Sequence, residues 1–321
     1  MAGSYKKIDY RLRPAKSIER KMLAESFRRL SEFGRVDLYR YIGLGSVYFS
    51  DFLLFHKVLG FKHMVSIEKA EDSVVQRRFV YNRPFEAVTM KFGHSNNVLP
   101  GLPWDVRSIV WLDYDGVLDK SVLNDVATVS SKVISGSLLL VSVNANVPKV
   151  SSDETEGGPK TAKDALERDV GKVKVSPTLE SKDLASWGTA KAYRSIINNQ
   201  IEETLKERNG VLSVGGRIKY SQLFNFNYSD GAKMLTVGGL FFDEAQEAIV
   251  SKCGFNHLEF YRNDEEAYFI DPPLLTFREM RALEQHLPLI NAPTDLPISV
   301  TDMQRYDGVY RYFPNFAETE I

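Results

Sequence analysis

Cysteine is the scarcest residue in this 321-residue sequence, which contains only Cys253. A single cysteine cannot form an intrachain disulfide or supply a cluster of thiolate metal ligands, and such usage is typical of a reducing compartment. Long apolar runs are also missing: none approaches the ~18 residues of a membrane-spanning helix, and the N-terminus lacks the apolar core of a signal peptide. We therefore expect a cytoplasmic protein without membrane contact, in which Cys253 is buried rather than reactive.

The formal net charge is only −1, but charge is distributed unevenly along the chain. Residues 1–40 contain 11 Lys and Arg against 5 Asp and Glu, whereas residues 259–321 contain 5 Arg against 12 Asp and Glu. Ordinary solvated helix faces explain such a pattern. The basic N-terminal region could also contact an anionic partner, and nucleic acid is one candidate.

Short apolar strands alternate with helices between residues 36 and 145. A first strand ends at the stretch YIGLGS, and further strands are expected at 63–68, 87–93, 108–113 and 137–145. Helices are expected between them at 48–60, 73–85 and 120–136. Near-continuous apolar strands separated by helices predict a parallel sheet that is covered on both faces. The predicted fold class is therefore α/β, a doubly wound, mostly parallel, Rossmann-like sheet.

Less regular regions flank this core. A basic helix is expected at 17–34, with Ser17 as its N-cap and Gly34 at its end. After the fifth strand, polar residues predict a mobile loop near 149–185, then a helix at 186–210 and a hairpin at 220–242. We divide the chain into an N-terminal basic helical segment (1–35), a cofactor-binding domain (36–242) and a C-terminal accessory subdomain (243–321).

A glycine turn after the first strand points to a nucleotide site. Gly43 and Gly45 let a ligand approach the backbone closely, and the helix that begins after Ser46 offers free N–H groups. Glu68 ends the second strand, 23 residues after Gly45, where a carboxylate can accept hydrogen bonds from both hydroxyls of a ribose. This combination predicts a ligand that contains adenosine.

With these motifs, the segment 36–145 resembles the class I S-adenosylmethionine-dependent methyltransferase superfamily. YIGLGS is similar to the glycine motif of that superfamily, although Tyr41 stands where an acidic residue is usual. The superfamily's sheet closes with two strands, the last antiparallel, which agrees with the hairpin at 220–242. The resemblance implies that S-adenosylmethionine is the cofactor and is bound by Gly43, Gly45, Ser46, Glu68 and His94, the last of which follows the third strand.

The stretch WLDYDGVLD at 111–119 admits two interpretations. Within the resemblance, Asp113 and Tyr114 end the fourth strand and face the methyl acceptor, Asp113 as hydrogen-bond acceptor or general base and Tyr114 as a stacking surface. The D-x-D-G pattern is also typical of a haloacid dehalogenase-type phosphatase, in which Asp113 attacks phosphorus and Asp115 protonates the leaving group. That chemistry needs a later acidic motif, and Gly239 stands where the acid is expected. We favour methyl transfer and predict no metal site.

We therefore predict an S-adenosylmethionine-dependent methyltransferase whose acceptor the sequence does not identify. The stretch IDPPLLTF at 270–277 has Leu274 where enzymes that methylate amino groups of nucleic acids carry a stacking aromatic, which favours an oxygen acceptor. A non-catalytic nucleotide-binding or interaction protein with the same fold is the third interpretation, besides the phosphatase.

Overall fold

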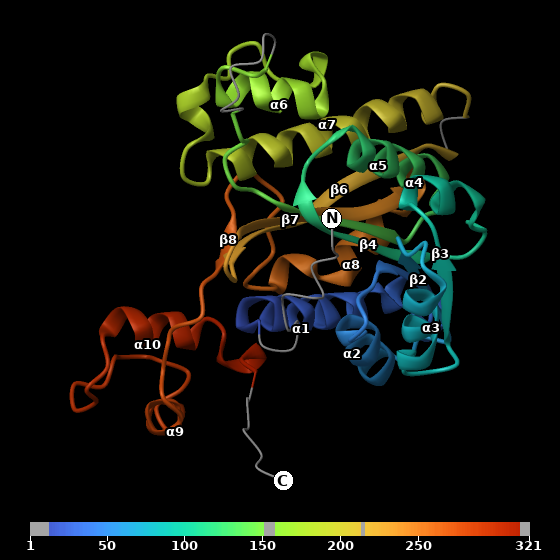
Figure 1. Cartoon of the computed structure of the whole chain (residues 1–321). Helices are drawn as coiled ribbons and strands as arrows, with labels where there is room; N and C mark the ends of the chain where they lie inside the picture. The colour runs from blue at the N-terminus through green and yellow to red at the C-terminus, as the bar shows by residue number, and fades with distance from the viewer. Residues whose placement is uncertain (1–12, 151–157, 213–215, 315–321) are drawn as a thin grey trace.

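Eight strands form one sheet in the computed structural model, which describes residues 13–150, 158–212 and 216–314 (Figure 1). Their order across the sheet is β3-β2-β1-β4-β5-β7-β6-β8. The strands are β1 (Arg40–Leu44), β2 (His63–Glu68), β3 (Val88–Phe92), β4 (Ser108–Val117), β5 (Ser137–Asn144), β6 (Ile218–Ser229), β7 (Lys233–Asp243) and β8 (Tyr268–Ile270). All neighbours are parallel except β7, which is antiparallel to both β5 and β6. The predicted mostly parallel α/β sheet is confirmed, and the predicted hairpin is β6 with β7.

The order of the strands reverses beside β1, where open α/β sheets have their ligand crevice. The chain passes from β1 outward through β2 to β3 and then returns to the other side of β1 with β4. The connections that leave the carboxyl ends of β1 and β4 therefore run in opposite directions, and ligands of open α/β sheets bind at such a switch point. The strands themselves are held by apolar runs; in β5, SLLLVSVN, every residue but the last is buried.

Helices cover both faces of the sheet, as Figure 1 shows. One layer contains α1 (Pro14–Arg28), α2 (Ser50–Leu59), α3 (Ser73–Asn82) and α8 (Glu247–Cys253), and the other contains α4 (Ser95–Val98), α5 (Lys120–Lys132), α6 (Ala162–Val170) and α7 (Gly188–Asn209). Each layer packs on its own apolar cluster, so that the sheet separates two cores. No helix within the described ranges is long and apolar enough to cross a membrane.

The N-terminal helix differs from its prediction at both ends. We expected residues 17–34 with Ser17 as N-cap, but α1 begins at Pro14 and ends at Arg28, followed by a 3-10 turn. Proline suits the first helical turn because its missing N–H would have no partner there. The capping acceptor is instead Asp230, in the turn between β6 and β7, whose carboxylate accepts hydrogen bonds from the backbone N–H groups of Ala15 and Lys16.

Two further segments are more regular than the sequence suggested. Strand β4 extends four residues past the predicted end at Asp113, through a shift in its register with β5. In the predicted loop near 149–185, residues 151–157 lie outside the described residues, and much of the rest is helical. The reason lies in α6, where Thr161 and Asp164 form a reciprocal cap and Leu166 is buried against the sheet.

The C-terminal region is divided between the sheet and a small satellite cluster. Strand β8 joins the edge of the main sheet next to β6, and the Asp-Pro-Pro sequence follows its end. Helices α9 (Phe277–Glu284) and α10 (Val300–Asp307) share a separate apolar cluster and lie apart from the two layers in Figure 1. The domain boundaries at residues 35 and 243 stay predictions.

Candidate cofactor and active site

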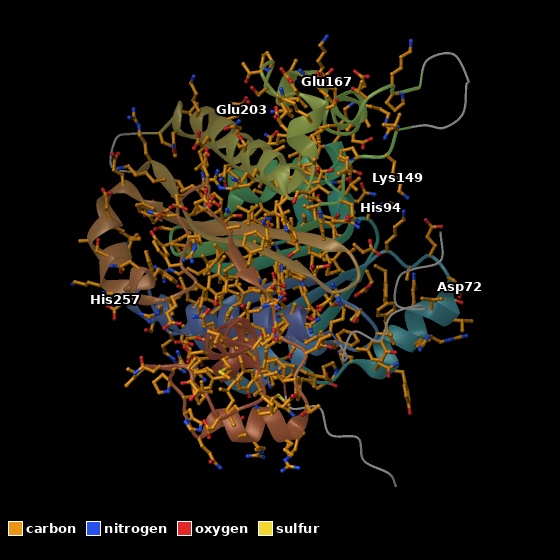
Figure 2. All side chains as sticks on the ribbon, turned by 90° about the vertical axis from the view of Figure 1, so that its left-hand side faces the viewer. Asp72, His94, Lys149, Glu167, Glu203 and His257 are labelled. Atoms are coloured by element: carbon orange, nitrogen blue, oxygen red, sulfur yellow. The ribbon has the colours of Figure 1, made fainter. Side chains whose placement is uncertain are left out.

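The predicted site residues meet at one edge of the sheet. Gly45 and Ser46 follow β1, Glu68 is the last residue of β2, His94 comes two residues after β3, and Asp113 lies in β4. Because these four strands are adjacent and parallel, their carboxyl ends lie together. Figure 2 shows the labelled residues that follow β2, β3 and β5, namely Asp72, His94 and Lys149, on one side of the molecule, with His257 on the opposite side.

The Glu68 carboxylate lies directly against the backbone of Gly45. It accepts hydrogen bonds from the Ser66 hydroxyl at 3.2 Å and from the backbone N–H of Gly45. A Cβ atom on Gly45 would lie 2.4 Å from the Ser66 Oγ and 2.5 Å from a Glu68 carboxylate oxygen. The glycine is therefore required here by close approach, and the carboxylate that would bind a ribose is packed against the turn that would bind the rest of the nucleotide.

Burial controls the ionisation of Glu68. The side chain is 8 % exposed, and removal from water raises its pKa to about 8, although the hydrogen bonds from Ser66 and Gly45 oppose the change. A carboxyl group with such a pKa is mostly neutral at pH 7. A ligand that donates hydrogen bonds to this group favours its charged form, so ligand binding and proton release are coupled at this position.

Tyr41 is hydrogen-bonded to an acidic side chain of the next helix. Its hydroxyl donates to the Asp51 carboxylate at 2.5 Å, and Asp51 lies in the first turn of α2. Burial raises the pKa of Asp51, and the nearby Arg20 opposes this rise. A carboxylate therefore does lie beside β1, but it comes from α2 rather than from the strand.

The turn between β1 and α2 is tight. The backbone N–H of Tyr48 donates to the Ser46 hydroxyl at 3.3 Å. Phe49, at the N-cap of α2, has a left-handed backbone with φ of +48° and a fully buried ring. A bulky residue in this region is strained and is held there by its packing, which is common next to ligand sites.

Asp113 forms an ion pair with a fully buried lysine from α1. Lys16 Nζ lies 2.7 Å from Asp113 Oδ1, 2.8 Å from Glu19 Oε2 and 3.1 Å from the Tyr228 hydroxyl. It also lies 4.2 Å from the centre of the Trp111 ring, in cation–π geometry. The side chains of Lys16 and Glu19 are at most 1 % exposed, whereas that of Asp113 is 24 % exposed. Asp113 is therefore the outermost member of the cluster.

Tyr114 points to the opposite face of the sheet, because neighbouring residues of a strand alternate. Its hydroxyl donates to the Asp125 carboxylate of α5 at 2.5 Å, and the amide of Asn96 donates to the other oxygen of the same carboxylate. Burial raises the pKa values of both Tyr114 and Asp125. The structure thus brings Asp113 and Tyr114 to the same strand end but connects them to different networks.

The remaining polar candidates are placed at the rim. His94 is exposed at the N-cap of α4, and its side chain forms no cap hydrogen bond. Asp115 is exposed, and Asp119 caps α5 by accepting from the backbone N–H of Val122. Among the described residues, no group of three or more His, Cys, Asp or Glu is arranged to hold a metal ion.

Several residues of this edge were not singled out from the sequence. Lys16 and Arg20 were noted only as part of a basic stretch, and Glu19, Asp51 and Tyr228 not at all. The helical spacing of Lys16 and Glu19 is a weak signal, because such pairs are common on exposed helix faces. Their burial becomes evident only when α1 is packed against the sheet.

The fold is that of a doubly wound α/β protein, and the candidate site residues lie at the carboxyl ends of its parallel strands, where the strand order reverses. A family model described as "Putative O-methyltransferase" matches residues 8–321, and the chain belongs to this family. The predicted resemblance to methyltransferases is thereby confirmed, and the phosphatase interpretation is not favoured. No curated protein matches the sequence.

Solved structures similar to this chain include proteins described as methyltransferases and proteins in complex with S-adenosylmethionine or SAH. Trm1 from Pyrococcus horikoshii, in complex with S-adenosyl-L-methionine, is 12 % identical with a TM-score of 0.45, and the match covers 72 % of this chain and 56 % of that one. An O-methyltransferase family protein from Burkholderia thailandensis is 10 % identical with a TM-score of 0.35, covering 70 % and 56 %. The methyltransferase PaMTH1 of Podospora anserina, bound to SAH, is 12 % identical with a TM-score of 0.31, covering 62 % and 70 %. The chain thus spans little more than half of the first two.

Proposed function

We propose that this protein transfers the methyl group of S-adenosylmethionine to an oxygen atom of an acceptor. The observation that carries the proposal is the contact between the Glu68 carboxylate and the Gly45 backbone, at the point where the strand order reverses. Membership of the O-methyltransferase family supports the same reaction and the same kind of acceptor atom.

The residues at the edge fit an adenosine ligand. Glu68 is a buried carboxyl group with capacity for two ribose hydroxyls, and the absence of a side chain on Gly45 lets Ser66 and Glu68 lie against the turn. Gly43 lies inside β1, between Ser66 and Trp111 of the neighbouring strands, and Ser46 lies in the turn that follows. His94 follows β3, where the resemblance to the superfamily implies contact with the adenine. When bound, the cofactor supplies an electrophilic methyl group on a positively charged sulfur.

Asp113 has one oxygen available for the acceptor. Its Oδ1 is bonded to Lys16, and no described residue donates a hydrogen bond to Oδ2. An acceptor hydroxyl that donates to this second oxygen would be aligned for in-line attack, which accounts for much of the rate in a reaction without covalent catalysis. The same carboxylate can take the proton that the hydroxyl loses. Tyr114 contributes its ring to the end of the same strand, while its hydroxyl stays with Asp125.

Nucleic acid is a weaker candidate for the acceptor than the sequence suggested. Of the basic stretch 11–21, Lys16 and Arg20 are buried, Arg13 lies 3.7 Å from Asp230, and Arg11 lies outside the described residues. Among the described residues near α1, Lys21, Arg28, Arg29 and Arg311 line a groove of 630 Å³ between α1 and α2, together with the acidic Glu25.

The buried free Cys253 supports the predicted cytoplasmic location.

The first experiment is a thermal-shift titration of the purified protein with S-adenosylhomocysteine, with ATP and NAD as matched adenosine controls. A ligand at 100 times its dissociation constant stabilises the native state by about 2.7 kcal/mol. We expect a selective shift with S-adenosylhomocysteine that is lost in Glu68→Ala. Equal shifts with all three nucleotides, or none with S-adenosylhomocysteine, would overturn the proposal.

Turnover is then tested with S-adenosylmethionine that carries a labelled methyl group and a panel of phenols, alcohols and carboxylic acids. Incorporation of label that falls sharply in Asp113→Asn, with binding of S-adenosylhomocysteine retained, supports catalysis at Asp113. Cofactor binding without transfer to any acceptor class, including cell extract, would favour the non-catalytic interpretation.

A further inference from the structure

The charged groups behind Asp113 form a stack that is deeper than a simple ion pair. Asp113 stands at the crevice, the Lys16 ammonium lies behind it, and the Glu19 carboxylate lies behind the ammonium. Glu19 is fully buried, and apart from its ion pair with Lys16 neither of its oxygens has a hydrogen-bond partner among the described residues. A carboxylate buried in this way is costly, so its place in the fold calls for a reason.

Glu19 adds a second negative charge to this stack. The stack contains two carboxylates, those of Asp113 and Glu19, and one ammonium group, that of Lys16. With these three groups charged, the excess is one negative charge. Without Glu19 the excess would be zero, and Asp113 would stand at the crevice as one half of a neutral pair.

We propose that Lys16 and Glu19 make Asp113 a recognition group for the positive charge of the sulfonium, so that the site prefers S-adenosylmethionine to its neutral product. Lys16 holds Asp113 in place through its ion pair, and Glu19 offsets the charge of the ammonium so that the field at the crevice stays negative. This inference rests on the proposed function, which places the sulfur of the cofactor near Asp113.

The charge change in the reaction explains why such a preference is useful. The bond between sulfur and the methyl carbon breaks, its electron pair stays on sulfur, and the methyl group joins the acceptor oxygen, whose proton passes to the Asp113 carboxylate and from there to water. The sulfonium thereby becomes a neutral thioether. A site with excess negative charge holds the positively charged cofactor more tightly than the thioether, and product release is favoured.

Glu19→Gln is the decisive variant, because Glu19 is fully buried behind Lys16 and cannot touch a ligand in the crevice. Dissociation constants for S-adenosylmethionine and S-adenosylhomocysteine are measured by calorimetry at low salt. We expect binding of S-adenosylmethionine to weaken on the order of fivefold, as for one charge acting at a distance through protein, with little change for S-adenosylhomocysteine. Glu25→Gln, on the outer side of α1 where Glu25 bonds the Tyr312 hydroxyl, is the matched control and should change neither constant.

The outcomes separate this inference from the proposed function. If Glu19→Gln weakens the binding of both ligands equally, the residue only supports the fold of α1. If neither dissociation constant changes, the charge of Glu19 does not reach the ligand. Either result overturns the inference. Failure of the wild type to bind both ligands would instead overturn the proposed function. If Glu19→Gln does not fold, Asp113→Asn removes the outermost charge at constant shape, and it should show the same selective loss for S-adenosylmethionine.

Discussion

The Asp230 carboxylate accepts a hydrogen bond from the backbone N–H of Lys16 at 2.9 Å, across 214 residues of the chain. The same lysine uses its ammonium group to hold Asp113 at the carboxyl end of β4. One residue of α1 is thus fixed at its backbone by the turn between β6 and β7 and at its tip by the active-site strand. The cap and the ion pair together determine where α1 lies on the sheet.

Removal of this cap should destabilise the protein without loss of the fold. We expect Asp230→Ala to lower the free energy of unfolding by about 1 kcal/mol, because two N–H groups of the first turn of α1 lose their acceptor. Urea denaturation measures the change. Asp230→Asn retains an acceptor oxygen and should lose less, and Asp295→Ala, at an exposed position, is the control. Equal losses for Asp230→Ala and Asp295→Ala would contradict the capping role.

Glu68 should make stability depend on pH. Its pKa is raised from 4.5 to about 8 in the folded protein, so the folded state binds a proton that the unfolded state has already lost between these values. Its contribution to stability is therefore complete below pH 4.5 and is lost as pH rises towards 8. Relative to Glu68→Gln, the wild type should lose about 1 kcal/mol per pH unit across this window. Parallel stability curves for the two proteins from pH 5 to 8 would refute this assignment.

The same group should make binding of S-adenosylhomocysteine depend on pH in the opposite sense. Ribose hydroxyls donate to the charged carboxylate, and the free protein must release the proton of Glu68 before it can accept them. Affinity should therefore increase from pH 6 to pH 8, by up to about tenfold per unit, and level off above the pKa of about 8. Calorimetric titrations in Glu68→Gln supply the comparison, in which the dependence should be nearly flat. An affinity that falls over this range would rule out a charged Glu68 in the complex.

A methyl group at Gly45 should abolish cofactor binding at little cost in stability. The added Cβ would meet the ends of two side chains, the Ser66 hydroxyl and the Glu68 carboxylate, which can move away. Gly45→Ala should therefore fold, with a loss of about 1 kcal/mol, while the displaced carboxylate no longer reaches the ribose. Thermal shift with S-adenosylhomocysteine measures the effect. Gly101→Ala is the control, because a Cβ there meets nothing within 4 Å. Normal binding by Gly45→Ala would show that the close approach is not needed.

Tyr114 can be tested for its two separate roles. Tyr114→Phe retains the ring but removes the hydrogen bond to Asp125, and it should lower the free energy of unfolding by about 1 kcal/mol or more. If the ring stacks on the acceptor, Tyr114→Phe should keep the Michaelis constant for that acceptor unchanged. Tyr114→Ala, which lacks the ring, should raise it. Tyr81→Phe, at a position that is 86 % exposed, is the control for stability. No difference in stability between the two phenylalanine variants would remove the hydroxyl from the structural network.

The parallel core could be predicted because its signals are local. Each of β1, β2, β3, β4 and β5 contains a short apolar run, and helices that the sequence also predicts separate β1 from β2, β2 from β3 and β4 from β5. The glycine turn and Glu68 were found for the same reason, since both lie at strand ends whose positions follow from that alternation. Strand order then brings them together without further information.

The surroundings of Asp113 could not be predicted, because they depend on contacts between distant parts of the chain. Lys16 belongs to a stretch of charged residues that is typical of an exposed helix, and only its three polar partners make its burial tolerable. The start of α1 was missed because its cap comes from Asp230. Tyr114 was grouped with Asp113 by sequence, although alternation along a strand directs neighbours to opposite faces.

The position of α1 also has a consequence for synthesis of the protein. The helix leaves the ribosome before the sheet, but Tyr228, which bonds the Lys16 ammonium, follows 212 residues later, and Asp230 comes after that. Until the hairpin of β6 and β7 has emerged, Lys16 has no complete set of partners, and burying it would be costly. The nascent chain can therefore begin to assemble β1 to β5 well before α1 docks. The candidate site is completed only when α1 packs against a hairpin that is made long after it.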